Sequence, residues 1–366
     1  MKNSSSTKDA KEVVLNSFFV FMDWKIYQST FKRLCTKRQI KKDDQEILLS
    51  YSFNLYKNDY PIVFDIEHLS FLVGYSEELF YAITNDTQLF YHSFFIPKKN
   101  GKKRLIREPY PTLKEIQYWI LNNILLKHPI SKYAKAYIKN KGLIDNVKFH
   151  KQQNVIIKLD VKNFFESITY FDVYSIFLRM GYVKSVSNML ARLCCLDEKL
   201  PQGAPTSPCL SNIFCILLDS RIGSYITKLN FRYTRYSDDI TISGDIKESQ
   251  IKSIIDFCEK TLSDFGLNLH KSKTKVLRQS NCQYVTGVVL NKKISAGVKQ
   301  KKKIRQSVYY IKKYGLDSHM QHIGLEKINY LNHLLGKINW VLYLEKGNKE
   351  FIEYKREIIN LIKDFY

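Results

Sequence analysis

Two segments of the sequence place carboxylates where apolar neighbours would bury them. In residues 232–243, RYTRYSDDITIS, polar and apolar residues alternate on both sides of a polar centre, which is typical of two strands joined by a tight turn. Asp238 and Asp239 lie at that centre. Asp160 ends the apolar run Val155–Leu159, where a charge is costly unless it is paired or bound to metal. If both segments lie in one sheet, the three acids meet at its edge.

Carboxylates gathered in this way suit Mg²⁺, which prefers oxygen ligands and keeps positions for substrate oxygens. Two such ions about 3.5–4 Å apart activate an attacking hydroxyl and stabilise the leaving oxygen of an in-line displacement. Nucleotidyl transfer needs that arrangement. The plainer interpretation is a surface turn, because Asp and Ser are favoured turn residues.

A rigid loop lies between the two acidic segments. The sequence LPQGAPTSP contains Gly203 between Gln202 and two prolines, and it predicts a bend before a helix from about Ser207 to Asp219. A glycine allows a ligand to approach the backbone closely. A loop before a helix also fits any α/β protein, so this feature alone decides little.

The order of four segments is more specific than any one of them. DVKNFF at 160–165, QGAPTSP at 202–208, YSDD at 236–239 and GLNLHKSKT at 266–274 resemble, in order and spacing, the palm motifs of reverse transcriptases. The resemblance covers about residues 90–300. It implies an α+β right-hand polymerase with fingers, a palm whose antiparallel sheet is flanked by helices, and a helical thumb.

The resemblance also implies roles for single residues. Asp160, Asp238 and Asp239 match the family's catalytic carboxylates, which hold two Mg²⁺ ions together with the backbone carbonyl of Val161. Phe165 matches the aromatic residue that crowds the sugar 2′ position and favours deoxynucleotides, whereas its neighbour Phe164 fits the core better. The other expected nucleotide-binding residues are Gln202, Gly203, either Lys271 or Lys273, and Lys103, Arg104 and Arg107.

Those last three residues belong to KKNGKKRLIREP, which resembles the fingers hairpin of the same family. Their positive charges would neutralise the triphosphate of a deoxynucleotide, and arginine does so with paired hydrogen bonds. Strand alternation puts Lys103 and Arg107 on one face and Arg104 on the other. An ordinary basic hairpin explains any one of them equally well.

Two further motifs are similar to signatures of retron reverse transcriptases. Residues 146–150, Asn-Val-Lys-Phe-His, resemble their Asn-Ala-x-x-His, and Val285-Thr286-Gly287 matches their Val-Thr-Gly. Val147 and Ser237 depart from the usual alanines. The structural alternatives are a glycine that relieves a bend and a buried histidine. We expect RNA binding by Asn146, His150, Val285, Thr286, Gly287, Lys301, Lys302 and Lys303.

Retron resemblance implies a particular set of partners and products. The enzyme would bind its own structured noncoding RNA as template and primer and begin synthesis from a guanosine 2′-hydroxyl. Its cDNA product would stay joined to the RNA as a branched molecule, msDNA, and serve in antiphage defence with an effector protein.

Charge and composition agree with a polyanionic partner. Lys and Arg number 58 against 35 Asp and Glu, a net charge of +23, and residues 291–313 hold nine basic and no acidic residues. We expect a helical region at 1–90, fingers and palm at 91–290 and a basic thumb at 291–366. The seven scattered cysteines and the short apolar stretch Val13–Met22, interpreted as a helix, favour a cytoplasmic protein without a membrane partner.

Three alternatives share part of this pattern. A group II intron-type or other bacterial defence reverse transcriptase would lack both retron signatures. A non-catalytic RNA-binding protein on a polymerase fold would not need three intact carboxylates and a complete Gln-Gly loop. An RNA-dependent RNA polymerase must admit the 2′-hydroxyl that Phe165 is expected to exclude.

Overall fold

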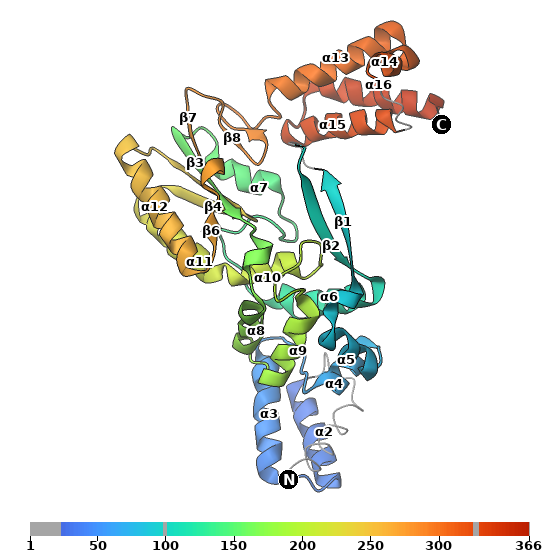
Figure 1. Ribbon diagram of the computed structural model, residues 1–366, viewed down its shortest axis with the longest axis vertical. Coiled ribbons are helices and arrows are strands. Elements are labelled where there is room, and N and C mark those ends of the chain that lie inside the picture. The colour runs from blue at the N-terminus through green and yellow to red at the C-terminus, as the bar shows by residue number, and fades with distance from the viewer. Residues whose placement is uncertain (1–22, 98–100, 325–328, 366) are drawn as a thin grey trace. The chain divides into compact units, whose positions relative to one another are not determined.

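The computed structural model describes residues 23–97, 101–324 and 329–365 (Figure 1). The predicted helix at Val13–Met22 lies outside these ranges, and so do residues 98–100, the first three of the segment that resembles the fingers hairpin. The chain forms two compact units, and each unit is made from three separate stretches of sequence. Unit 1 contains Met1–Lys132, Val161–Ser220 and Thr261–Asn268, and unit 2 contains Tyr133–Asp160, Arg221–Lys260 and Leu269–Tyr366. The division at residues 90 and 290 therefore stays a prediction.

The described part of unit 1 opens with helices, of which α4 shows capping at both of its ends. They are α2 (Trp24–Lys37), α3 (Lys42–Lys57), α4 (Ile66–Val73) and α5 (Glu77–Asn85). Asp65 caps α4 by accepting a hydrogen bond from the His68 amide at 2.9 Å. Gly74 ends α4 with φ of 88°, a left-handed conformation that favours glycine.

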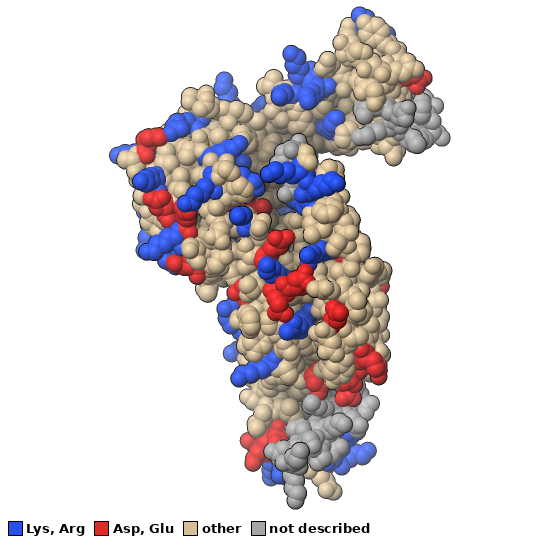
Figure 2. Space-filling model, in the orientation of Figure 1, with Lys and Arg blue, Asp and Glu red and all other residues tan. Residues whose placement is uncertain are grey.

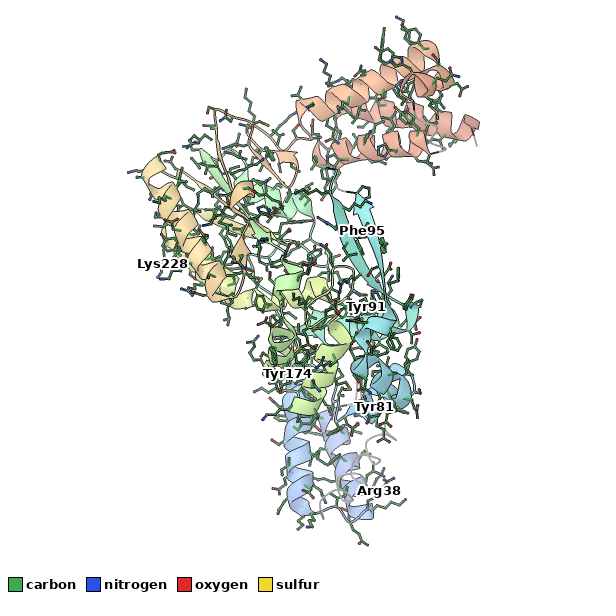
Figure 3. All side chains as sticks on the ribbon, viewed as in Figure 1. Arg38, Tyr81, Tyr91, Phe95, Tyr174 and Lys228 are labelled. Atoms are coloured by element: carbon green, nitrogen blue, oxygen red, sulfur yellow. The ribbon has the colours of Figure 1, made fainter. Side chains whose placement is uncertain are left out.

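A β-hairpin follows these helices. Strands β1 (Tyr91–Pro97) and β2 (Lys103–Pro109) form an antiparallel hairpin, as the segment KKNGKKRLIREP predicted, and Tyr91 lies opposite Pro109 (Figure 3). Helix α6 (Pro111–Asn123) holds the base of the hairpin, because Gln117 Nε2 donates to Tyr91 Oη and to the Leu193 carbonyl, both at 2.8 Å. The rest of unit 1 is mainly α8 (Tyr170–Arg179), α9 (Lys184–Cys194) and α10 (Ser207–Phe214).

The palm sheet is the centre of unit 2. Its strands are β3 (Val155–Lys162), β4 (Arg232–Tyr236), β5 (Asp239–Gly244), β6 (Asn268–Leu269) and β7 (Lys275–Arg278). Their order is β4-β5-β3-β6, and β7 also pairs with β3. The pairings of β3 with β5, of β3 with β7 and of β4 with β5 are all antiparallel. Helix α12 (Glu248–Asp264) follows β5, and the described chain has the mixed α+β architecture that the motifs predicted.

The C-terminal helices share one core with the palm. They are α13 (Val298–Tyr314), α14 (Leu316–His322), α15 (Tyr330–Leu344) and α16 (Lys349–Phe365). A short hairpin of β8 (Tyr284–Val285) and β9 (Val288–Val289) precedes them. Val285 and Val288 are fully buried in a cluster with residues of α13, α15 and α16, and Ile156 of β3 belongs to the same cluster. Burial of this apolar surface ties the thumb helices to the sheet.

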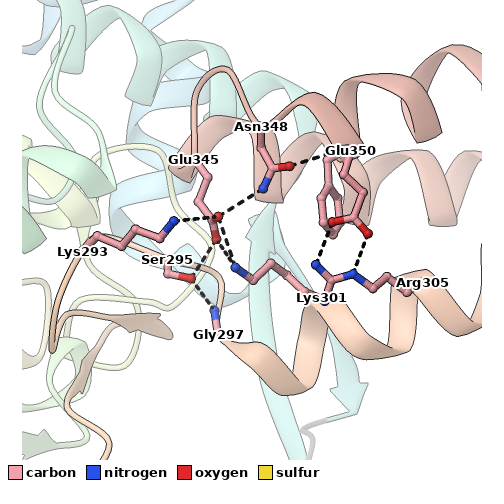
Figure 4. A network of polar contacts seen from close by, with 9 residues as sticks. Lys293, Ser295, Gly297, Lys301, Arg305, Glu345, Asn348 and Glu350 are labelled. Carbon is pink, nitrogen blue, oxygen red and sulfur yellow. Dashed lines mark hydrogen bonds and ion pairs between the residues drawn. The ribbon is translucent and has the colours of Figure 1, made fainter.

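A polar network joins the start of α13 to the end of α15 (Figure 4). Glu345 is 9% exposed and accepts hydrogen bonds from Ser295 Oγ at 2.7 Å and Lys301 Nζ at 3.1 Å. Burial alone would raise the pKa of Glu345, but these two donors hold it below its usual value. The side chain of Lys301 is only 13% exposed, and its ammonium group forms an ion pair with Glu345. Of the three lysines predicted to bind RNA, Lys302 and Lys303 are therefore the ones exposed to a phosphate backbone.

The basic surface is visible in Figure 2, where Lys and Arg side chains gather near the start of α13. No single helix within residues 23–97, 101–324 and 329–365 is long and apolar enough to cross a membrane. Only α10 and α11 (Ile216–Lys228) taken together reach the necessary length and composition, and they are bent by 49°.

We expect Lys301→Met to lower the free energy of unfolding by roughly 2 kcal/mol, because it removes the nearer of the two lysines that pair with the buried Glu345 and leaves only Lys293 at 3.9 Å. Lys302→Met, which removes the same charge from an exposed position, should leave it unchanged. Urea denaturation followed by circular dichroism measures both. Equal stability of the two variants would show that the ion pair adds nothing to the thumb.

Candidate active site

The carboxylates predicted to be catalytic are placed by strand register. The turn between β4 and β5 is Ser237-Asp238, with Ser237 at φ of 61°, and β5 begins at Asp239. Asp160 of β3 lies directly opposite Asp239 in the antiparallel pairing of β3 with β5. Residues opposite one another in such a pair have Cβ atoms about 4.5–5.5 Å apart. The sheet therefore brings together the acids that the sequence predicted would meet.

Two side chains of unit 2 hold the turn that carries these acids. Tyr137 Oη donates a hydrogen bond to Ser237 Oγ at 3.1 Å. The buried Arg235 guanidinium donates to the Ser237 carbonyl at 3.2 Å. Ser237, which replaces the usual alanine, thus gives Tyr137 a partner. The sequence did not identify Tyr137, because nothing in its neighbours indicates a contact one hundred residues away.

The negative charges of the three acids repel one another. Burial, followed by the negative charge of Asp238, raises the pKa of Asp239 to about 6. Asp160 adds to this rise, whereas Lys158 and Lys273 oppose it. Crowded carboxylates of this kind are stabilised by a divalent cation, and their oxygen donors suit Mg²⁺.

The acids do not form a complete metal site by themselves. Within the described residues, no three His, Cys, Asp or Glu side chains are placed so that they alone could hold a metal ion. Mg²⁺ sites of this class use one or two carboxylates and take their remaining ligands from water and substrate phosphates. Val161, the next residue on β3, has its side chain buried. The donor set therefore fits a substrate-completed Mg²⁺ site.

The structure separates the two lysines between which the sequence did not choose. Lys273 Nζ lies 2.7 Å from Asp160 Oδ1. Lys271 pairs instead with Glu259 of α12 at 2.8 Å. Both belong to the turn after β6, which is anchored where the His270 amide donates to the Asp160 carbonyl at 2.8 Å. Only Lys273 of this pair contacts a catalytic carboxylate.

Phe165, a predicted nucleotide-binding residue of unit 1, differs from its neighbour Phe164 in burial. Phe164 is 4% exposed and belongs to the core, while the side chain of Phe165 is partly exposed. The two rings lie 5.5 Å apart at 60°. This difference in burial supports Phe165 over Phe164 as the residue available to a sugar, although its role stays a prediction.

The Gln202-Gly203 loop contacts β2 closely. The Arg107 amide donates to the Gln202 carbonyl at 2.9 Å. A Cβ atom on Gly203 would come within 2.5 Å of the Arg107 carbonyl, and φ of 140° further favours glycine. Close packing against β2 is therefore sufficient to explain Gly203.

Of the three basic hairpin residues, Arg107 is already paired. Its guanidinium forms an ion pair with Asp197, which also accepts a hydrogen bond from Gln88 Nε2 at 2.6 Å. The side chains of Lys103 and Arg104 are exposed. The sequence did not identify Asp197, since a single acid in a loop carries no recognisable pattern. Triphosphate binding stays a prediction for all three basic residues.

Comparison with known proteins agrees with this geometry. The model of the family "Reverse transcriptase (RNA-dependent DNA polymerase)" matches residues 96–290. The chain is 29% identical over 307 residues to the retron Ec86 reverse transcriptase of Escherichia coli, covering 83% of this chain and 92% of that protein. It is 30% identical over 294 residues to the Escherichia coli retron Ec83 enzyme, covering 75% and 90%, respectively. The retron Mx162 enzyme of Myxococcus xanthus is 31% identical over 233 residues, 56% of this chain and 48% of its own.

The chain belongs to the retron reverse transcriptase family. It is therefore an RNA-directed DNA polymerase, as the palm motifs predicted.

The first signature of this reverse transcriptase is a buried hydrogen-bond network. Asn146 and His150, at the ends of α7 (Leu143–Val147) and the following 3-10 turn, are both fully buried. Thr234 Oγ1 donates to Asn146 Oδ1 at 2.6 Å and lies 2.7 Å from His150 Nε2. Because that hydroxyl proton is already used, Nε2 must donate to Thr234, and Nδ1 accepts from Ser243 Oγ at 2.7 Å. His150 thereby links β4 to β5.

The second signature is a hairpin turn. Thr286 and Gly287 connect β8 to β9 with φ of 47° and 84°, the two positive values that a type I′ turn requires. Val285 is fully buried in the thumb core. Burial argues against direct RNA contact by Asn146, His150 and Val285 in this conformation. Their assignment to RNA binding stays a prediction, and their visible contacts are structural.

Burial lowers the pKa of His150 to about 3, from an ordinary value near 6.5. As pH falls below 6.5, His150 is protonated in the unfolded chain, whereas in the folded protein it stays neutral until about pH 3. The free energy of unfolding therefore decreases between pH 6.5 and 3 by up to about 1.4 kcal/mol per pH unit. We expect His150→Gln to reduce this dependence, and His322→Gln, at an exposed histidine, to retain it. Chemical denaturation at several pH values measures the slopes, and parallel slopes for all three proteins would contradict the buried neutral His150.

Proposed function

We propose that this reverse transcriptase copies part of its own structured noncoding RNA into DNA and produces a branched RNA–DNA molecule, msDNA. Synthesis begins from a guanosine 2′-hydroxyl of that RNA and consumes deoxynucleoside triphosphates. The observation that carries the catalytic part is the register of β3 and β5, which sets Asp160 opposite Asp239 next to Asp238. The branched product and a role in antiphage defence with an effector protein are supported by the family alone.

Asp160, Asp238, Asp239 and the Val161 carbonyl would hold two Mg²⁺ ions, and these would supply the positive charge needed to activate a hydroxyl and to stabilise a leaving pyrophosphate. The protein's own contribution is to keep these acids together despite their repulsion. The turn contacts of Ser237 fix Asp238, and the β3–β5 pairing fixes the other two acids. We assign Lys273, rather than Lys271, to the triphosphate, because its ammonium group already lies at Asp160.

Phe165, Gln202 and Gly203 would contact the incoming deoxynucleotide, with Lys103, Arg104 and Arg107 near its phosphates. The charge of Arg107 is already shared with Asp197, so we rank Lys103 and Arg104 before it. Lys302 and Lys303 are exposed on α13 and suit the backbone of an RNA–DNA duplex. The partially buried Lys301 supports the helix that carries them.

We expect Asp238→Asn to abolish DNA synthesis while RNA binding is retained, because the carboxylate serves metal ions and not the basic surface. Purified protein is tested for primer extension and, separately, for RNA affinity by filter binding. Asp245→Asn, at an acid after β5, is the matched control and should polymerise normally. Synthesis by the Asp238 variant would remove the metal assignment.

The nucleic acid that copurifies with the protein tests the product. A branched species sensitive to both RNase and DNase is expected from the parental protein and absent from the Asp238→Asn variant. A linear cDNA would leave the polymerase activity in place but contradict the branched product.

We expect Phe165→Val to admit ribonucleotides, because a smaller side chain leaves room for a 2′-hydroxyl. The measurement is the ratio of kcat/KM for a deoxynucleotide to that for the matching ribonucleotide. Phe171→Val, at a residue of α8 that is 72% exposed, should not change the ratio. An unchanged ratio in the Phe165 variant would show that another residue selects the sugar.

A further inference from the structure

Residues 133–142 form a strap that begins at the edge of the palm sheet. A single parallel bridge pairs Ala134 of the strap with Arg235 of β4. The Arg235 amide donates to the Tyr133 carbonyl at 2.9 Å, and the Lys135 amide donates to the Arg235 carbonyl at 2.8 Å. These bonds hold the start of the strap beside the strand that leads into the turn carrying the acids.

The ring of Tyr133 fixes the start of the strap in unit 2. It lies against Gly223 of α11, where a Cβ atom would come within 2.3 Å of the ring. It also packs against the ring of Tyr233, with the two centres 5.2 Å apart. The next alternate residues, Ala134 and Ala136, are buried. The strap therefore starts from a well-packed point, and the residue that follows Ala136 is positioned from there.

That residue, Tyr137, reaches the turn formed by Ser237 and Asp238. Its backbone has φ of 59°, a left-handed conformation that is uncommon for residues other than glycine. Its side chain is 47% exposed, so burial does not explain why the chain keeps this conformation. The contact that the conformation permits is the hydrogen bond from Tyr137 Oη to Ser237 Oγ at 3.1 Å. Unusual backbone of this kind is concentrated at functional sites.

The other end of the strap contacts the thumb. A Cβ atom on Gly142 would come within 2.6 Å of the hydroxyl of Tyr343, which belongs to α15. Helix α7, which follows the strap, packs against the core of the thumb helices. Tyr236, the residue before the turn, has its pKa raised mainly by burial and further by Tyr137 and Tyr343. Turn, strap and thumb helix therefore come close together within unit 2.

We propose that Tyr137 is a positioning residue for Asp238 and that the strap passes the position of the thumb to the turn. The inference rests on the proposed role of Asp238 in holding metal ions. Tyr137 holds the Ser237 hydroxyl, and Arg235 holds the Ser237 carbonyl, which belongs to the peptide bond before Asp238. Catalysis is sensitive to such contacts, because a displacement of about 1 Å can cost roughly 100-fold in rate.

The first test uses Tyr137→Phe, which removes the hydroxyl and keeps the ring, and Ser237→Ala, which removes its partner. Tyr118→Phe, at a tyrosine of α6 that is 46% exposed, is the matched control. For each protein, kcat and the nucleotide KM are measured on an ordinary primer–template, together with the duplex affinity and the melting temperature. Hydrogen–deuterium exchange of residues 232–243 is followed without substrate.

We expect Tyr137→Phe and Ser237→Ala each to lower kcat roughly five- to tenfold, because the turn loses one hydrogen bond. The combined variant should be no slower than either single variant, since both changes remove the same contact. The KM, the duplex affinity and the melting temperature should stay near their parental values, whereas exchange at the turn should become faster. Tyr118→Phe should match the parental protein.

An unchanged kcat in Tyr137→Phe would overturn the positioning role. So would an additive combined variant, or a loss of kcat with an equal loss of duplex affinity, because either result shows a general structural effect. Exchange requires no synthesis. It therefore distinguishes a failure of the turn contact from a failure of the metal assignment, which Asp238→Asn tests separately.

The second test concerns the thumb end of the strap. Gly142 has φ of −124°, which alanine adopts without strain, so Gly142→Ala adds only a methyl group against the Tyr343 hydroxyl. In the combined variant with Tyr343→Phe, the nearest ring carbon lies 3.9 Å from that methyl group, an ordinary contact. We expect Gly142→Ala to lower kcat and to speed exchange at the turn, and the combined variant to restore both. Parental values in Gly142→Ala, or a loss that Tyr343→Phe does not relieve, would overturn the link between thumb and turn.

Discussion

The pairing of β3 with β5 is the constraint on which the catalytic site depends. Ile157 lies opposite Ile242 and Leu159 opposite Ile240, and all four are buried. A slip by one residue would exchange these side chains with Lys158 and Asp160 on the other face, so burial fixes the register strongly. The same register sets Asp160 against Asp239. Burial of these four apolar residues thus maintains an electrostatic repulsion between the acids.

Two lysines near the acids reduce this repulsion. Lys273 contacts Asp160 directly, and Lys158 acts on Asp239 from two residues farther back along β3. The acids are therefore compensated only in part by the protein, which leaves room for metal ions and phosphates. Further along β3, Ile156 is buried under the thumb cluster. Strand β3 thus carries, in order, Ile156 in the shared core, the basic Lys158 and the carboxylate of Asp160.

Patterns that repeat locally could be predicted from the sequence, whereas contacts between distant residues could not. Alternation around Asp238 and the apolar run before Asp160 sufficed to predict the sheet edge. Nothing local distinguished Lys271 from Lys273, because their roles depend on which neighbour each reaches after folding. The Lys158–Lys275 pairing depends on a register between strands more than one hundred residues apart. The signature residues were recognised, and a buried histidine was the alternative for His150, but the sequence did not decide for it and did not indicate that Asn146 is buried.

The interleaving of the two units affects how the chain can be made. Unit 1 includes Thr261–Asn268, so its last stretch leaves the ribosome long after the N-terminal helices. At about 5–20 residues per second, synthesis as far as residue 268 takes roughly 15–50 s. During this time, the apolar faces of the first helices and of the β1–β2 hairpin lack the last stretch of the chain that completes unit 1. Protection of the nascent chain from aggregation is thus a requirement of this topology, and neither unit can be produced as one continuous fragment.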